Sequence, residues 1–241
     1  MTPDRMTARL RPGEIRYPRR VRSAADAVRY INAVGFCLLF PLKNLPLPSL
    51  YFACARRELT RWDRYCLLIW KWKDHLGSRR AAFYSKYFHG RGTFICLEFL
   101  PHFLALESSS WRADDFDRAY SAGRISADAR SLWEALATHG PLATLELRHA
   151  CNFDSIAGNR RFKKAALQLS RLLVVFHSGA EQETDSWASN RFELTARAFP
   201  AAVAAAEKIS LAEARRTLAA KYLEWHPDAA PRTIARLFGP E

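Results

Sequence analysis

Residues 126–200 limit the possible folds more than any other part of the chain, because helical and extended patterns follow one another there in a distinctive order. Ser126 can cap the first, apolar-periodic helix, and Gly140-Pro141 ends it. The expected elements are, in chain order, a helix between Ser126 and Gly140, a short helix over 142–150, a helix over 157–172, and strands over 172–176 and 191–196. Three helices followed by a hairpin predict a winged helix-turn-helix unit, with residues 177–190 as the wing loop.

The third helix of this unit carries an uncompensated positive charge. No acidic residue occurs between 158 and 171, whereas a solvated helix face usually mixes both signs. Such a helix can enter a major groove, while the wing touches the neighbouring backbone. The residues predicted to contact DNA are Asn159, Arg160, Arg161, Lys163, Lys164, Gln168 and Arg171 on the helix and His177, Asn190 and Arg191 on the wing. The alternative is a unit used for dimerisation or packing, and the acids Glu181, Glu183 and Asp185 argue against a DNA contact by the wing loop.

Positive charge also gathers elsewhere in the chain, whose net charge is +13. Residues 56–91 hold ten Lys or Arg against three acids, and residues 1–22 hold seven Arg against two. In the segment WKWK, Trp70 and Trp72 alternate with Lys71 and Lys73, an arrangement typical of nucleic-acid binding, and both lysines are predicted to contact DNA. Double-stranded DNA is therefore the expected partner, and no segment is amphipathic enough to favour a membrane surface.

Composition excludes several other classes of protein. Hydrophobic residues make up 49% of the 241, so the chain can build a large core. The five cysteines stand singly without a C-x-x-C pair, so neither a disulfide framework nor a metal site is expected, and no nucleotide-binding or hydrolase motif predicts a cofactor. No apolar run is long enough to span a membrane, and a cytoplasmic, nucleoid-associated protein is expected.

The whole chain is expected to be mostly α with small β-hairpins and tandem winged helix-turn-helix domains. Its first such domain starts with a Ser23-capped helix and includes a helix from Asp63 to Ser78 that Gly77 is expected to end. The predicted divisions are a flexible basic arm over 1–22, a first winged-helix-like domain over 23–110, a linker over 111–125, a second winged helix over 126–199 and a helical segment over 200–241. The last segment can be interpreted as half of a third helix-turn-helix, but a helical cap on the neighbouring domain is the favoured interpretation.

Three local sequences carry a resemblance to a known family: WKWKDHL, the FPL that follows the first helix, and Y-x-x-Y-F-H-G-R-G-T-F from Tyr84. Together with the downstream unit they resemble, over 23–238, the winged-helix crosslink-repair DNA glycosylases called AlkZ- or YcaQ-like. The resemblance implies tandem winged helices acting on DNA, in a shortened relative without the family's C-terminal β-barrel.

The family's catalytic motif is replaced in this sequence. The resemblance implies a Gln-x-Gln or Gln-x-Asp motif before a proline, where Leu38 and Phe40 stand here. Because neither side chain can orient or deprotonate water, a DNA-binding protein without hydrolytic activity is the leading hypothesis. The rival is a DNA glycosylase that uses Asp74 or Glu98, and a third possibility is a module for protein contacts. The sequence leaves the oligomeric state and the DNA sequence or lesion open.

Overall fold

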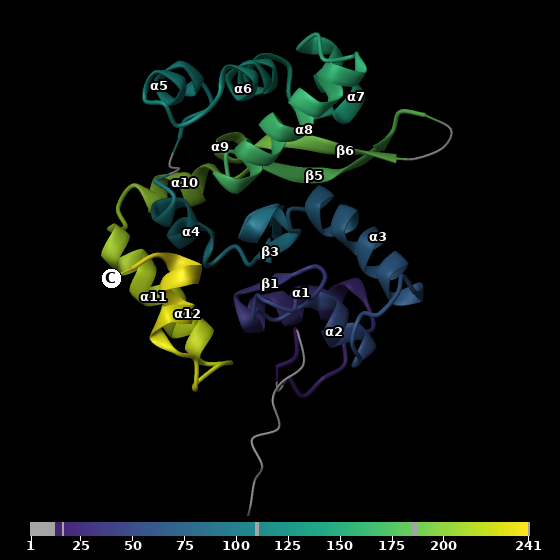
Figure 1. Cartoon of the computed structure of the whole chain (residues 1–241), viewed down its shortest axis with the longest axis vertical. Coiled ribbons are helices and arrows are strands. Elements are labelled where there is room, and N and C mark those ends of the chain that lie inside the picture. The colour runs from purple at the N-terminus through teal and green to yellow at the C-terminus, as the bar shows by residue number, and fades with distance from the viewer. Residues whose placement is uncertain (1–12, 16, 109–110, 185–187, 241) are drawn as a thin grey trace, which may run out of the picture.

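The computed structural model describes residues 13–15, 17–108, 111–184 and 188–240, and it consists mainly of helices with two small sheets (Figure 1). The predicted fold class, mostly α with small β-hairpins, is thereby confirmed. The first unit contains α1 (Ala24–Val34), β1 (Phe36–Leu38), α2 (Leu50–Ala55), α3 (Arg64–Ser78), β2 (Phe83–Ser85), the 3₁₀ turn η1 (Phe88–Gly90), β3 (Thr93–Ile95) and α4 (Leu100–Leu106). Its sheet is antiparallel with the order β1-β3-β2.

The second unit repeats this order of elements. It contains α5 (Phe116–Ser121), α6 (Ala127–His139), β4 (Leu142–Ala143), α7 (Thr144–Ala150), α8 (Ile156–Arg171), β5 (Val175–Gln182), β6 (Ala188–Leu194) and α9 (Thr195–Ala198). Its antiparallel sheet has the order β4-β6-β5, so the last strand is again central. From α1 to β3 and from α6 to β6, each unit therefore runs helix, strand, helix, helix, strand, strand.

Local hydrogen bonds explain why the main helices begin where the sequence predicted. The Ser23 hydroxyl accepts from the Asp26 amide at 3.1 Å, and the Asp26 carboxylate accepts from the Ser23 amide at 3.1 Å. Asp63 caps α3 by accepting from the amides of Tyr65 and Cys66 at 2.9 and 3.1 Å. Burial raises the pKa of Asp63, but hydrogen bonds from Arg57, Tyr51 and these amides outweigh it and lower the pKa to about 2.

The C-terminal helices pack on the first unit. They are α10 (Pro200–Ala206), α11 (Leu211–Leu223) and α12 (Pro231–Phe238), and in Figure 1 they lie beside α4. The Phe238 ring lies 5.7 Å from that of Phe36, which in turn is 5.2 Å from Phe103. A buried aromatic cluster of this kind stabilises a fold by roughly 1.5–3 kcal/mol per ring, so these helices belong to the core of the first unit.

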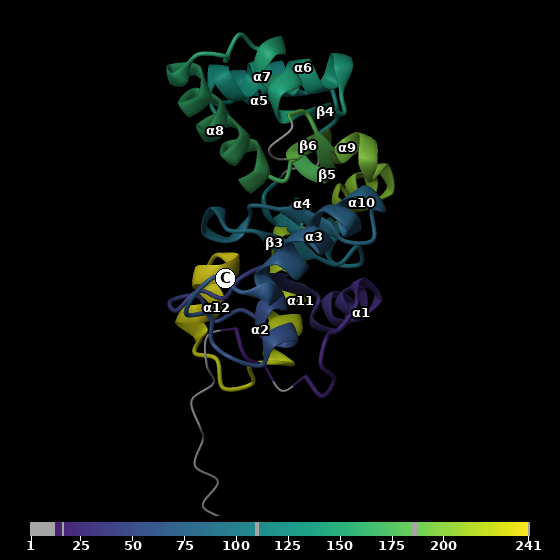
Figure 2. The same cartoon turned by 90° about the vertical axis from the view of Figure 1, so that its right-hand side faces the viewer.

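The two units share a buried contact, formed mainly by β5 on α3 and β2. Phe176 of β5 stacks at 5.7 Å on Phe83 of β2, and the Ser85 hydroxyl donates to the Ser170 carbonyl at 2.7 Å. Figure 2 shows the resulting elongated molecule, with the second unit above the first and α8 and α12 on the same side. The relative position of the two units is therefore set by packed side chains and not by a flexible connection.

Four local expectations need correction. The first hairpin strand was expected over 172–176, but Leu172 to Val174 form a turn with Leu173 at φ 57°, and β5 therefore begins at Val175. The strand then continues to Gln182, through residues that were expected in the wing loop. The expected linker over 111–125 contains α5, and the predicted helix over 142–150 begins two residues later because 142–143 pair as β4 with β6. Residues 13–15 and 17–22 of the expected arm pack on α2, where Val21 is buried; residues 1–12 and 16 lie outside the described residues.

Candidate nucleic-acid interface

Helix α8 presents one continuous cationic face. Ser155 caps it by accepting from the Gly158 amide at 2.9 Å, and Phe162, Ala165 and Leu169 bury its inner side. The opposite side follows the spacing i, i+3, i+4, i+7, i+11, which keeps residues on one helical face. This face, called the α8 stripe below, consists of Arg160, Lys163, Lys164, Leu167 and Arg171. Within the described residues, no carboxylate forms an ion pair with its four cations.

Two of the predicted helix residues have structural contacts instead. The Arg161 guanidinium binds both oxygens of Asp128 at 2.5 and 3.0 Å and lies 4.8 Å from the Phe153 ring. The Gln168 carboxamide accepts from the Ser126 amide and hydroxyl at 3.1 and 2.9 Å. Arg161 and Gln168 therefore fasten α8 to the start of α6, whereas Asn159 is half-buried beside the stripe.

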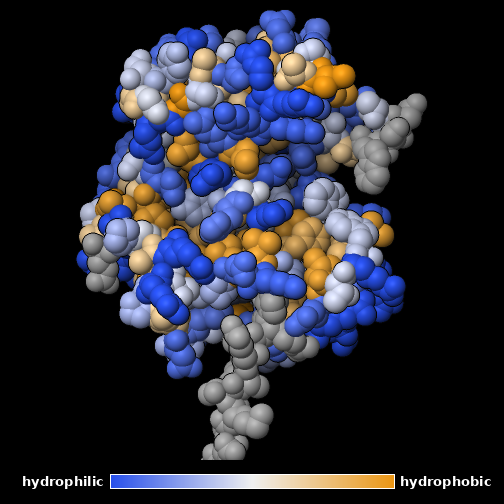
Figure 3. All heavy atoms as spheres, in the orientation of Figure 1, coloured by the Kyte–Doolittle hydropathy of each residue, from blue (hydrophilic) through white to orange (hydrophobic). Residues whose placement is uncertain are grey.

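A hollow of about 640 Å³ lies where the C-terminal half of α8 meets the first unit and α12. Its cations come from three parts of the chain: Arg124 before α6, Lys164 and Arg171 on α8, and Arg236 on α12. Glu107 is the lining carboxylate, and it accepts a hydrogen bond from Tyr87 at 2.5 Å. Figure 3 shows this side of the molecule, with hydrophobic residues gathered at mid-height between hydrophilic upper and lower regions. The cationic lining makes this hollow suited to an anionic ligand.

The hairpin of β5 and β6, which was predicted to be a wing, faces the protein interior over part of its length. His177 is only 3% exposed and packs against the rings of Tyr84 at 5.2 Å and Phe192 at 4.8 Å. Burial, together with the charges of Lys73 and Lys86, holds the pKa of His177 well below its usual range. A buried neutral imidazole cannot reach phosphate, so the predicted DNA contact by His177 is not retained.

The remaining wing residues also make internal contacts. The Asn190 carboxamide oxygen accepts from Lys73 at 3.0 Å, and Arg191 is half-buried with its Nε 3.6 Å from Glu181. Glu183 accepts from the amides of Leu145 and Glu146 at 2.9 and 3.1 Å, which caps α7. These wing acids therefore stabilise the second unit, and Asp185 lies outside the described residues.

The four residues of the WKWK segment do not form one surface: two are exposed and two are buried. Successive helical residues are rotated by about 100°, so residues two apart point to different sides. Trp72 is 8% exposed and belongs to the core, whereas Trp70 is 41% exposed. Lys71 is exposed, but Lys73 is 2% exposed, pairs with Asp74 and lies 4.8 Å from the Trp70 ring. Burial lowers the pKa of Lys73, although the negative charge of Asp74 opposes this shift. Of the two lysines, only Lys71 is exposed enough to contact a phosphate group.

Lys86 is a further cation beside α8. It follows β2 directly after Ser85, whose hydroxyl donates to the Ser170 carbonyl of α8, and its side chain is exposed. Loss of hydration, and then the positive charges of Lys73 and Lys163, lower the pKa of Lys86. Sequence reasoning did not single out Lys86, Arg124 or Arg236, because only the fold brings them next to α8.

Leu38 and Phe40, which the resemblance places at the family's catalytic motif, carry no polar side-chain group. Leu38 is fully buried in β1, and the Phe40 ring, which is half-buried, lies 5.5 Å from Trp62 and 6.5 Å from Trp70. The rival acids are not brought together by any described contact: Asp74 pairs with Lys73, and Glu98 is exposed between β3 and α4. Among the described residues, no group of three or more His, Cys, Asp or Glu is placed to hold a metal ion.

A mostly helical fold with two units of the same element order, combined with an acid-free cationic helix, is suited to contact with a polyanion. The chain belongs to the AlkZ-related family, whose model matches residues 21–239. This membership confirms the resemblance drawn from the sequence and points to a role on DNA. Neither a curated protein nor a solved structure matches the chain. In the described part of the chain, every helix is too short or too polar to cross a membrane.

Proposed function

We propose that this protein binds duplex DNA through the α8 stripe, in a tandem winged-helix architecture and without hydrolysing the DNA. The repeated order of helices and strands supports the architecture, because in a winged helix-turn-helix the third helix is the one that enters a groove. By this reading α3 and α8 are the two groove-facing helices, and the C-terminal helices cap the first unit.

The observation that carries the proposal is the α8 stripe. Four cations without acidic partners among the described residues stand within four turns of one helix, and the hollow beside them adds Arg124 and Arg236. Such a row suits consecutive phosphates, whose neutralisation releases condensed counterions. A protein-contact surface of the same kind would require a strongly acidic partner.

We therefore expect duplex binding to depend steeply on salt. If the four cations of the stripe each meet one phosphate, the slope of log affinity against log salt is about −3.6, and affinity falls roughly 100-fold between 50 and 200 mM salt. Fluorescence anisotropy with a labelled duplex of arbitrary sequence measures this slope. A flat titration, or no binding at low salt, would contradict the proposal and favour a protein-contact module.

We also expect no base release from duplexes that carry alkylated purines or interstrand crosslinks. Leu38 and Phe40 offer no group to orient water, and general acid–base catalysis is typically worth about 10²- to 10⁴-fold. The measurement is strand cleavage after alkali treatment, followed on denaturing gels. Multiple-turnover excision that is lost in Asp74→Ala or Glu98→Ala would establish the glycosylase alternative instead.

A further inference from the structure

Three aromatic side chains form a platform on the first unit, defined here as the half-buried Phe40 and the exposed Trp62 and Trp70. They come from the segment after β1, the residue before the α3 cap and the second turn of α3. The ring centres of Trp62 and Trp70 are 6.2 Å apart, and Phe40 lies nearly parallel to Trp70 at 18°. Trp62 is 58% and Trp70 is 41% exposed. Large aromatic rings exposed together on a protein surface mark a site of interaction.

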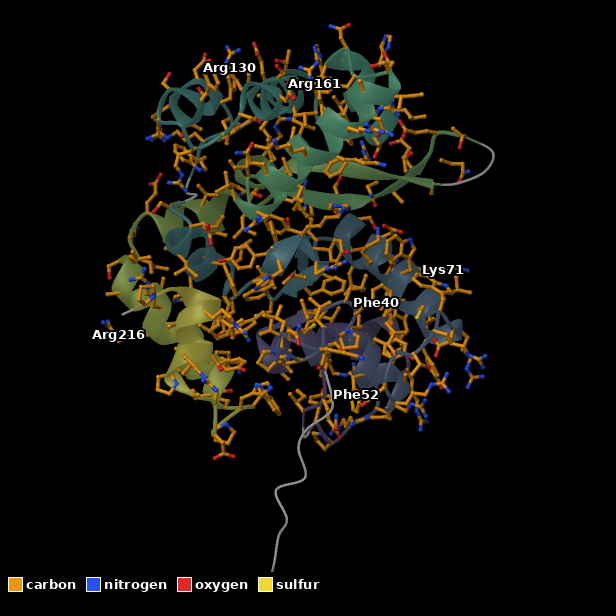
Figure 4. The ribbon with its side chains drawn as sticks, viewed as in Figure 1. Phe40, Phe52, Lys71, Arg130, Arg161 and Arg216 are labelled. Carbon is orange, nitrogen blue, oxygen red and sulfur yellow. The ribbon has the colours of Figure 1, made fainter. Side chains whose placement is uncertain are left out.

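The surroundings of the platform are cationic. Lys73 lies 4.8 Å from the Trp70 ring, where it engages the electron-rich face. Arg61, Arg64 and Lys71 are exposed within about two turns of the platform residues. The nearby acids are already engaged, Asp63 by Arg57 and Asp74 by Lys73. Figure 4 shows Phe40 and Lys71 on the same lobe, on the side of α3. The expected occupant is therefore an anionic molecule that also has a flat apolar surface.

The segment after β2 joins the first unit to the α8 helix. The Ser85 hydroxyl donates to the Ser170 carbonyl of α8 at 2.7 Å, and Gly90 faces the Leu167 side chain. Lys86 lies between these two contacts in the chain and is exposed, so it adds a positive charge beside the α8 stripe on the unit that carries the platform.

We propose that the platform binds an unpaired nucleobase of DNA by stacking, while the α8 stripe holds the adjoining duplex; this rests on the proposed function. Every base has an aromatic face that stacks on such side chains, so the contact needs no particular sequence. In an intact duplex both faces of each base are already covered by neighbouring pairs. Only a base that is bulged, flipped or left without a partner exposes a face to Trp62 and Trp70, so the platform selects disrupted DNA.

The test compares two duplexes that are identical except for one unpaired thymine, by fluorescence anisotropy at constant salt. The full chain is expected to bind the duplex with the unpaired base about tenfold more tightly, since one stacked base is worth roughly this factor or more. Trp62→Ala with Trp70→Ala should remove this preference and leave binding of the paired duplex nearly unchanged. Trp62→Phe with Trp70→Phe should restore most of the preference, because stacking needs an aromatic ring.

Leu67→Ala is the matched control, since Leu67 is 54% exposed on the same helix but carries no ring. It should keep the full preference. Equal affinity of the unaltered protein for the two duplexes would overturn the platform proposal alone, and so would a preference that survives in the double alanine variant. Failure to bind either duplex would overturn the proposed function itself. Thermal unfolding of each variant verifies that the substitutions at these exposed positions leave the protein folded.

Discussion

Replacing Arg160, Lys163 and Lys164 together by alanine is expected to weaken duplex DNA binding about 100-fold, if each cation contributes roughly 1 kcal/mol. The three side chains are exposed and stand within two turns of the α8 stripe, so they meet neighbouring phosphates at the same time. The salt dependence should also flatten, by about 0.9 in the log–log slope for each contact that is lost. Anisotropy titrations at several salt concentrations give both quantities.

The matched control removes three exposed cations elsewhere: Arg29, Lys208 and Arg216. Arg216 lies on the edge of the molecule opposite Lys71 in Figure 4. This control changes the net charge equally, but it should weaken binding only slightly. Circular dichroism should show both variants folded, because Phe162, Ala165 and Leu169 still bury α8. Equal losses in the two variants would mean that net charge, and not the stripe, determines DNA affinity.

Gly77→Ala is expected to lower the free energy of unfolding by roughly 1–3 kcal/mol, the typical cost of overpacking. A methyl group at this position would stand 2.4 Å from the backbone oxygen of His177, so β5 would have to move away from α3. Helix propensity alone predicts the opposite sign, since alanine is about 1 kcal/mol better than glycine inside a helix. Denaturant unfolding therefore decides between the two effects by the sign of the change.

The neighbouring Ser78→Ala serves as the control for this prediction. Ser78 is exposed in the same turn, and its change removes one hydroxyl that donates to the His75 carbonyl at 3.0 Å. We expect a change within about 0.5 kcal/mol, as for most surface substitutions. A stabilised Gly77→Ala variant would show that α3 and β5 can separate at little cost, which is incompatible with a rigid contact between the units.

The sequence by itself determined the helices that depend on local hydrogen bonds. Ser23, Asp63 and Ser126 cap their helices through amides two or three residues away, so these contacts depend on residues that are close in sequence. The α8 stripe is equally local, because 3.6 residues per turn place its cations on one face wherever the helix docks. The apolar pair Leu38 and Phe40, at the place where the resemblance implies a catalytic motif, is likewise a property of the sequence alone.

Only the tertiary structure decided which of these residues are available to a ligand. Arg161 stays exposed but is paired with Asp128, which is 33 residues away, and Lys73 is buried against a hairpin whose Asn190 is 117 residues away. The helix α3 ends at Ser78 as the sequence predicts, but Arg79 and not Gly77 stands at its C-terminal cap, and the glycine instead lets the β5 backbone approach. Contacts of this kind form only when the two units pack together. The free energy of that packing comes from many side chains that are distant in sequence, so a local pattern does not contain it. The local pattern therefore predicts the elements, and the packing decides what each element can bind.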